Sequence, residues 1–323
     1  MITIKRICLF VTLTALLLSP LGAETKSFSI SPQAGFLYGQ SEEIVFMYPK
    51  SNNYLSELLW DIKPLVYAGI AANFEPIDPF NYTGLSSSLS LKIGIPLNTG
   101  IMEDRDWMNP SHNYPTHYSR HDNYTKSAIL SDLSVGYSWR LNDFLSLKAF
   151  AEFSFMHFSW SGENGYYQYP TTEYPANYPP WNDDLPKIYF EDITKDGRVI
   201  LYSQNWFIFA PGISLKCRLG NITSLEGIIN YTPLIYCSDR DDHLLTGSTY
   251  YDYTFFGHYL KGSGAFHISA SDNLSFSLAL SYKLITGTRG DIYEGKYYSE
   301  NLAGTGFSAF DLAIAATIRL FNR

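Results

Sequence analysis

The sequence predicts an all-β protein, a ten-stranded antiparallel up-and-down transmembrane β-barrel with long extracellular loops. Apolar and polar side chains alternate along most of the chain, as in strands with one face toward lipid and the other toward a barrel interior. Aromatic residues make up 16% of the chain, with 26 Tyr and 21 Phe, and the net charge is −8. After the first 23 residues, no run of 18 or more apolar residues could form a membrane-spanning helix.

The first residues have the features of a secretory signal peptide. Lys5 and Arg6 precede an apolar run from Ile7 to about Leu18, and a small-residue cleavage site follows that ends at Ala23. We expect residues 1–23 to be removed and the mature protein to leave the cytoplasm. Residues 24–323 contain no linker or internal repeat, so they are expected to form a single domain.

Turn signals divide the mature chain into ten predicted strands of about 10 to 17 residues. An even number of strands suits a bacterial up-and-down barrel, and a soluble β-sandwich should have shorter strands. The predicted strands cover residues 27–40, 58–74, 83–97, 127–141, 145–160, 204–219, 224–238, 254–269, 274–284 and 307–321.

The connections between these strands fall into two classes. Residues 75–82, 142–143, 220–223 and 270–273 form short connections, whereas the segments after the first, third, fifth, seventh and ninth strands are long and polar. Short turns at one rim and long loops at the other are typical of bacterial outer-membrane barrels. We therefore expect an outer-membrane location, with the long loops on the cell exterior.

Two short motifs carry ionisable side chains at positions i and i+2, which a strand places on one face. Asp104 and Asp106 follow the third strand, and Asp241 and His243 follow the seventh. Glu43 follows the first strand, so all five residues can meet at the same rim. An Asp beside an imidazole raises the pKa of the imidazole, which lets the pair take a proton from water near neutral pH.

Each motif alone also fits simpler interpretations. An Asp-rich loop containing a His is more often a solvated loop. An Asp-x-Asp sequence occurs in calcium loops, but Asp104 and Asp106 lack the Gly and terminal Glu of that template. Ser119 could act as a nucleophile with His121 or His243, yet no oxyanion or elbow motif surrounds it, which favours a supporting hydrogen bond. We expect no metal and no cofactor.

Taken together, four landmarks resemble the omptin family of outer-membrane endoproteases in identity, order and position. They are Asp104-x-Asp106-Trp107-Met108, Ser119-Arg120-His121, Ser238-Asp239-x-Asp241-x-His243, and Gly35-x-Leu37-x-Gly39 followed by Glu43. The similarity in hairpin rhythm extends over the whole mature chain. The resemblance implies a ten-stranded barrel that protrudes above the outer membrane, with an acidic groove across its mouth.

The resemblance also implies an aspartyl-type mechanism in which water is the nucleophile. In that family a His–Asp dyad and an opposed Asp pair activate a water that attacks the peptide carbonyl. By position these catalytic residues are His243 with Asp241, and Asp104 with Asp106. Two neighbouring carboxyl groups tend to share a proton, so one can donate while the other stays ionised. Which of the two does so stays open.

Substrate and lipid contacts are likewise implied by the resemblance. Omptins cleave next to Lys or Arg through an acidic pocket, whose two carboxylates correspond to Glu43 and Asp239. They also hold lipopolysaccharide through charged side chains on the outer wall. The corresponding positions here are Phe153, Phe155, His157 and Asn205, so that clamp is mostly lost and another outer-membrane lipid or regulator is expected.

Three other classes of protein compete with an endopeptidase. A barrel of this fold could bind cationic peptides or host matrix as an adhesin or receptor without cutting them. A general porin is less favoured because no eyelet of opposed basic and acidic residues is recognisable. A soluble sandwich is least favoured. We expect peptide or protein substrates with Lys or Arg as partners, together with outer-membrane lipid, and no nucleic acid.

Overall fold

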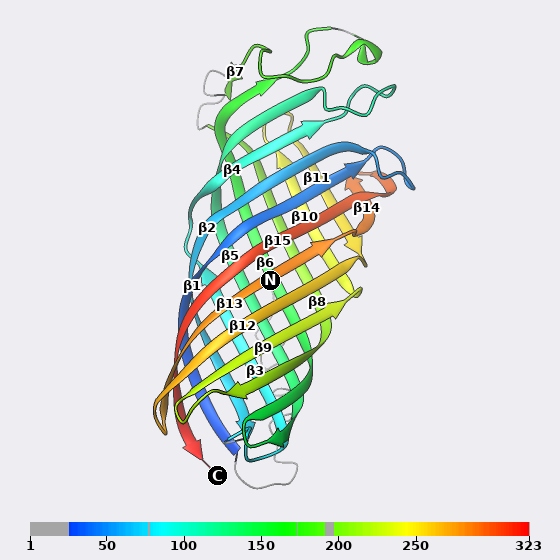
Figure 1. Ribbon diagram of the computed structural model, residues 1–323. Coiled ribbons are helices and arrows are strands. Elements are labelled where there is room, and N and C mark those ends of the chain that lie inside the picture. Colours follow the sequence, from blue (N-terminus) through cyan, green and yellow to red (C-terminus); the bar gives the residue numbers. More distant parts are fainter. Residues whose placement is uncertain (1–25, 77, 173, 191–196, 323) are drawn as a thin grey trace.

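The computed structural model describes residues 26–76, 78–172, 174–190 and 197–322, and the predicted signal peptide lies outside them. Within these residues the chain forms one long, tilted β-barrel with strand extensions and loops at one end (Figure 1). None of the described helices is long and apolar enough to cross a membrane.

The described residues form ten long strands, four of them interrupted. The uninterrupted ones are β1 (Lys26–Phe46), β2 (Tyr54–Pro76), β5 (His117–Asn142), β6 (Leu145–Gln168), β8 (Arg198–Arg218) and β15 (Tyr297–Asn322). The interrupted ones are β3 (Gly84–Gly94) with β4 (Leu97–Asp106), β9 (Thr223–Thr232) with β10 (Ile235–His243), β11 (Ser248–Phe255) with β12 (His258–Ser271), and β13 (Leu274–Thr286) with β14 (Arg289–Glu294). The 3-10 helix η1 (Pro175–Asn177) and β7 (Ile188–Tyr189) lie in the connection between β6 and β8.

Antiparallel pairing closes these strands into a ring. Each long strand pairs with its neighbours in sequence, and β1 pairs with β15 from Ser27 opposite Asn322 to Val45 opposite Ala303. The predicted ten-stranded up-and-down barrel is therefore confirmed. The interruptions coincide with residues that disturb a ladder: Pro96 and Pro233 lack the N–H that a ladder needs, and Gly257 and Gly287 have positive φ values of 130° and 72°.

The strands extend further toward the mouth than the sequence predicted. β1 continues to Phe46, β10 continues to His243, and β5 begins already at His117. The prediction of long loops after the seventh and ninth strands was wrong. The strands continue there, and residues 244–247 and 295–296 form tight turns between them. Strands that project beyond the apolar belt need no lipid-compatible face, so their hydropathy pattern fades while the hydrogen-bond ladder continues.

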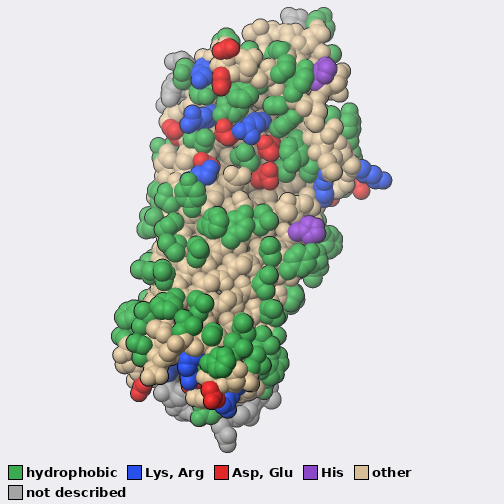
Figure 2. All heavy atoms as spheres, viewed as in Figure 1, with side chains coloured by type: hydrophobic (Ala, Val, Ile, Leu, Met, Phe, Trp, Pro, Cys, Tyr) green, Lys and Arg blue, Asp and Glu red, His purple; other side chains and the backbone are tan. Residues whose placement is uncertain are grey.

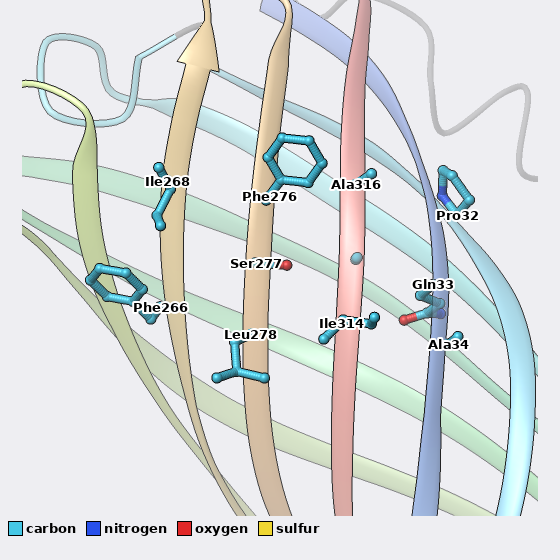
Figure 3. A pocket seen from close by; sticks show the side chains of 11 residues that line it. Pro32, Gln33, Ala34, Phe266, Ile268, Phe276, Ser277, Leu278, Ile314 and Ala316 are labelled. Atoms are coloured by element: carbon cyan, nitrogen blue, oxygen red, sulfur yellow. The ribbon is translucent and has the colours of Figure 1, made fainter.

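An apolar belt surrounds the middle of the barrel. Figure 2 shows charged side chains gathered toward the two ends of the molecule, with hydrophobic side chains and backbone between them. Figure 3 shows a shallow hollow in this outer wall, lined by Phe266 and Ile268 on β12, Phe276 and Leu278 on β13, and Ile314 and Ala316 on β15. These outward-facing side chains suit contact with lipid acyl chains.

Aromatic side chains fill the barrel below the mouth. Trp60 stacks on Trp160 and Tyr202, with ring centroids 5.8 and 5.2 Å apart, and all three are at most 1% exposed. On its upper side this layer contacts the site, because the Tyr202 hydroxyl donates a hydrogen bond to Asp239. On its lower side Met156 meets Lys283, one member of a cluster of charged residues in the lumen. The aromatic layer therefore separates two charged regions.

Candidate active site

Carboxylates from strands far apart in the sequence meet at the mouth of the barrel. Glu43 on β1 is buried, and the charges that act most strongly on it belong to Asp241, Asp239, Asp252 and Asp104. These residues lie on β10, β11 and β4, so the ring closure brings them together. All the residues that the sequence singled out lie within strands, and their side chains are therefore positioned by ladders on both sides.

Asp241 and His243 form a hydrogen-bonded dyad on β10. The Nε2 atom of His243 lies 2.6 Å from Oδ2 of Asp241. Strand alternation places both side chains on the inner face, and the β8 ladder pairs Asp241 with Tyr202. Asp241 is buried, whereas the His243 side chain keeps 38% of its surface exposed. Water can therefore reach the imidazole while the carboxylate that orients it stays dry.

The charges around His243 favour its protonated form. Burial alone lowers the pKa of this imidazole, but the hydrogen bond to Asp241 and the charges of Asp241, Asp104 and Asp106 outweigh burial and raise the pKa above its ordinary value. The charges of Asp104 and Asp106 act on His243, so the two predicted halves of the site lie within electrostatic range of each other. An imidazole in this setting can accept a proton from water and stabilise the resulting positive charge.

The Asp pair on β4 retains protons more strongly than ordinary carboxyl groups. Burial and the neighbouring charge of Asp106 raise the pKa of Asp104 well above its usual range, and burial raises the pKa of Asp106 to about 6. The Ser56 hydroxyl lies 3.4 Å from Oδ1 of Asp104 and works against this shift. Near neutral pH the pair can therefore hold a proton and donate it to a developing negative charge.

Ser119 lies in the wall beside this Asp pair. In the ladder between β4 and β5 it stands opposite Asp104, and its Oγ lies 3.1 Å from Nε2 of His121. The Nδ1 atom of His121 lies 2.9 Å from the carbonyl oxygen of Asn164. A carbonyl only accepts, so Nδ1 donates and Nε2 accepts the Ser119 proton. Burial lowers the pKa of His121 to about 4, in agreement with a neutral ring.

A second set of carboxylates forms a buried pocket next to the dyad. Oxygen atoms of Glu43, Asp239 and Asp252 all lie within 4.8 Å of one another, and each of the three residues is at most 4% exposed. Burial and mutual repulsion raise the pKa of Glu43 and of Asp239, and burial followed by the Asp241 charge raises that of Asp252 to about 8. Such a space can accept one compact cationic group or a cation.

Asp252 did not appear among the residues predicted from the sequence. It lies on β11 opposite Asp239 in the ladder with β10, but the sequence placed this stretch in a loop. The local signal was Gly247, which ends the four-residue turn 244–247 with a positive φ of 73°. With that turn recognised, alternation would have directed Asp252 toward the same interior as Asp239.

Comparisons with known proteins agree with this architecture. The model of the Omptin family matches residues 24–317. The plasminogen activator of Yersinia pestis is 27% identical over 233 residues, which is 71% of this chain and 66% of that protein, slightly less than two thirds of its length. The crystal structure of the outer membrane protease OmpT from Escherichia coli has a TM-score of 0.76 at 19% identity and shares the fold over 91% of this chain and 97% of that chain. The chain belongs to the omptin family and is a β-barrel of the bacterial outer membrane.

Proposed function

We propose that this protein is an endopeptidase that cleaves peptide bonds next to basic residues, with water as the nucleophile. The observation that carries the proposal is the hydrogen bond of 2.6 Å between His243 and Asp241. The charges of Asp104 and Asp106, a pair that retains a proton, act on the same imidazole. The family supports it, because the two similar proteins are described as a plasminogen activator and an outer membrane protease.

The geometry assigns a role to each side of the site. His243 takes a proton from water as the water oxygen bonds to the peptide carbonyl carbon, and Asp241 stabilises the imidazolium that forms. The protonated member of the Asp104/Asp106 pair donates a hydrogen bond to the carbonyl oxygen as it becomes negative. His243 then returns its proton to the leaving amine as the C–N bond breaks. This is an aspartyl-type mechanism with no covalent enzyme intermediate.

The buried carboxylates supply the preference for basic side chains. Glu43 and Asp239 are buried beside the dyad, and each has one carboxylate oxygen with no hydrogen-bond partner among the described residues. A Lys or Arg side chain next to the cleaved bond would neutralise them. Desolvated opposite charges at short range strengthen such a contact. Substrates are therefore peptides or proteins that carry accessible basic residues.

The site is proposed to face the cell exterior. It lies at the rim opposite the start of β1 and the end of β15, which pair with each other at Ser27 and Asn322. The connections at the opposite rim, such as residues 143–144 and 272–273, are short. In bacterial outer-membrane barrels the short turns are periplasmic, which orients the active site outward.

Peptide cleavage by the refolded barrel tests this function. We expect cleavage of a quenched peptide with an Ala-Arg-Arg-Ala core, little cleavage of its Ala-Gln-Gln-Ala counterpart, and a loss of roughly 10²–10⁴-fold in turnover in His243→Ala. The double variant Glu43→Gln, Asp239→Asn should raise KM for the Arg peptide and flatten the preference over Gln, and high salt should weaken substrate capture. Binding of the Arg peptide without cleavage would favour an adhesin or receptor instead.

A further inference from the structure

Asp252 is a third pocket carboxylate whose burial no protein contact explains. It is 1% exposed, and neither of its carboxylate oxygens has a hydrogen-bond partner among the described residues. Burying a carboxyl group without a hydrogen-bond partner is costly whether it is ionised or protonated, so such groups are rare unless a ligand completes them. The Asp252 carboxylate is aimed at the oxygens of Glu43 and Asp239, within 4.8 Å.

The three carboxylates differ in how many oxygens they leave free. The Tyr202 hydroxyl donates to Oδ2 of Asp239 at 3.1 Å, which leaves only Oδ1 unpaired. Glu43 contributes the unpaired Oε2, whereas Asp252 contributes both Oδ1 and Oδ2. Tyr202 itself is fixed from behind, because Nε2 of Gln204 donates to its hydroxyl oxygen at 2.9 Å. Of the three, Asp252 alone therefore has both carboxylate oxygens buried and without a hydrogen-bond partner among the described residues.

We propose that Asp252 determines specificity by making the pocket prefer arginine over lysine. The inference rests on the proposed cleavage next to basic residues. A guanidinium carries five N–H donors in a planar fork and pairs with a carboxylate through two parallel hydrogen bonds, whereas an ammonium has three donors on one atom. The four unpaired oxygens of the pocket exceed what an ammonium can satisfy. A guanidinium can engage Asp252 through both oxygens and still reach Glu43 and Asp239.

The charge of the pocket adds a pH signature to this assignment. The titratable groups that face Asp252 are Glu43 on β1, Cys237, Asp239 and Asp241 on β10, and Tyr202 on β8. Its ladder partner on β14 is Ile292. The pKa of Asp252 is about 8, so the empty pocket gains negative charge as the pH rises through that value. KM for an Arg peptide should fall over this range, and the fall should disappear when Asp252 is replaced by Asn.

The test compares two quenched peptides that differ only by Arg or Lys before the cleaved bond. In Asp252→Asn we expect kcat/KM for the Arg peptide to fall by about 10- to 100-fold, mainly through KM, and to fall much less for the Lys peptide. The matched control is Asp242→Asn, because Asp242 is a neighbouring carboxylate bonded to Arg240 on the outer face of the same hairpin. The control should keep both the Arg preference and the pH trend.

Stability separates a role in binding from a role in folding. Asn has the size of the neutral carboxyl group that a pKa of about 8 gives Asp252 near neutral pH, so Asp252→Asn should fold with an unfolding midpoint close to that of wild type, and loss of folding contradicts the proposal. A wild-type protein without any preference for basic residues would overturn the proposed function. A wild-type Arg preference that survives in Asp252→Asn would overturn only this inference. Activity that requires calcium and is abolished by a chelator would show that the three carboxylates are metal ligands, which also contradicts it.

Discussion

Two clusters of buried charge lie inside the barrel, one in the lumen and one at the mouth, and they are built differently. In the lumen the buried carboxylates of Glu152 and Asp311 each have an ammonium partner. Lys261 Nζ lies 2.9 and 3.0 Å from the two carboxylate oxygens of Glu152, and Lys92 contacts Asp311. At the mouth, Glu43, Asp239 and Asp252 face one another, and the charges that act most strongly on Glu43 all belong to carboxyl groups.

The difference separates structural charges from functional ones. A buried ion pair with additional hydrogen bonds recovers much of its desolvation cost within the folded protein, as when Tyr67 donates to Asp311 at 2.5 Å beside Lys92. Carboxylates without such a partner are unfavourable for folding, and under the proposed function a cationic substrate group would supply the missing partner. The lumen cluster therefore fills and holds the barrel, and the mouth cluster is available to a substrate.

The largest effect is expected at the dyad. Replacing Asp241 by Asn, or His243 by Ala, should lower turnover by roughly 10²–10⁴-fold, because the general base is misoriented or removed. The measurement is kcat on an Arg peptide. Asp242→Asn is the matched control, since its side chain is bonded to Arg240 and Thr249 and should leave turnover unchanged.

Folding must be intact for that comparison to hold. Heat-modifiable migration in gels, which reports a closed barrel, should be the same in wild type and in both variants. Wild-type turnover in a correctly folded Asp241→Asn would exclude this dyad from catalysis.

The lumen cluster should show the opposite behaviour, a large effect on stability and none on the chemistry. Lys261→Met leaves Glu152 buried without its partner and should lower the free energy of unfolding by about 3 kcal/mol. The double variant Lys261→Met, Glu152→Met removes both charges and should lose less. Urea unfolding of the refolded barrel gives both values.

An exposed ion pair provides the reference for this experiment. Lys126 Nζ lies 2.7 Å from Glu163, with the Lys126 side chain 48% exposed, so Lys126→Met should cost less than about 1 kcal/mol. If Lys261→Met were no more costly than Lys126→Met, the lumen pairs would not be structural. Peptidase activity of folded Lys261→Met should equal that of wild type.

A smaller effect is expected on the titration of His243. Its pKa is raised above the ordinary value in the wild type, so the neutral base is lost as the pH falls through that raised pKa. Asp106 has a pKa of about 6 and is therefore ionised where His243 titrates, so Asp106→Asn removes one negative charge that raises this pKa. The pKa of His243 should therefore move down, and the neutral imidazole should persist to lower pH.

Proton NMR of the imidazole resonances measures this shift directly. The His243 signal can be assigned by its absence from the spectrum of His243→Ala. An unchanged pKa in Asp106→Asn would show that the two halves of the site are not electrostatically coupled. Replacing Asp143, an exposed residue in the short turn 143–144 at the opposite rim, gives the control.

The sequence predicted the barrel well because alternation within the membrane belt is enforced by lipid on one face. Ten strands, their order and the short turns followed from that pattern. Above the belt this constraint ends. The sequence therefore predicted that the strands end before Glu43, Asp104 and His243 and assigned these residues to loops, whereas they lie within strands. The motif residues were still identified because each pair has the i and i+2 spacing. Asp252 was missed because its proximity to Asp239 exists only across the ladder.

The smallest effect is expected from lipopolysaccharide, which we predict changes activity little. The four wall positions considered for a lipid clamp lie on β6 and β8, and they offer no Lys or Arg to pair with phosphate. Phe155 packs against Phe207 with ring centroids 5.1 Å apart, and Nδ1 of His157 lies 2.9 Å from Oδ1 of Asn205, so these two polar groups engage each other. Phe153 is exposed on the same outer wall and suits an acyl chain.

Peptidase activity of the detergent-refolded barrel, measured before and after addition of lipopolysaccharide, should therefore stay the same. A change from inactive to fully active would show that other residues bind lipopolysaccharide. It would also show that activity requires this lipid although the wall has lost its charged side chains.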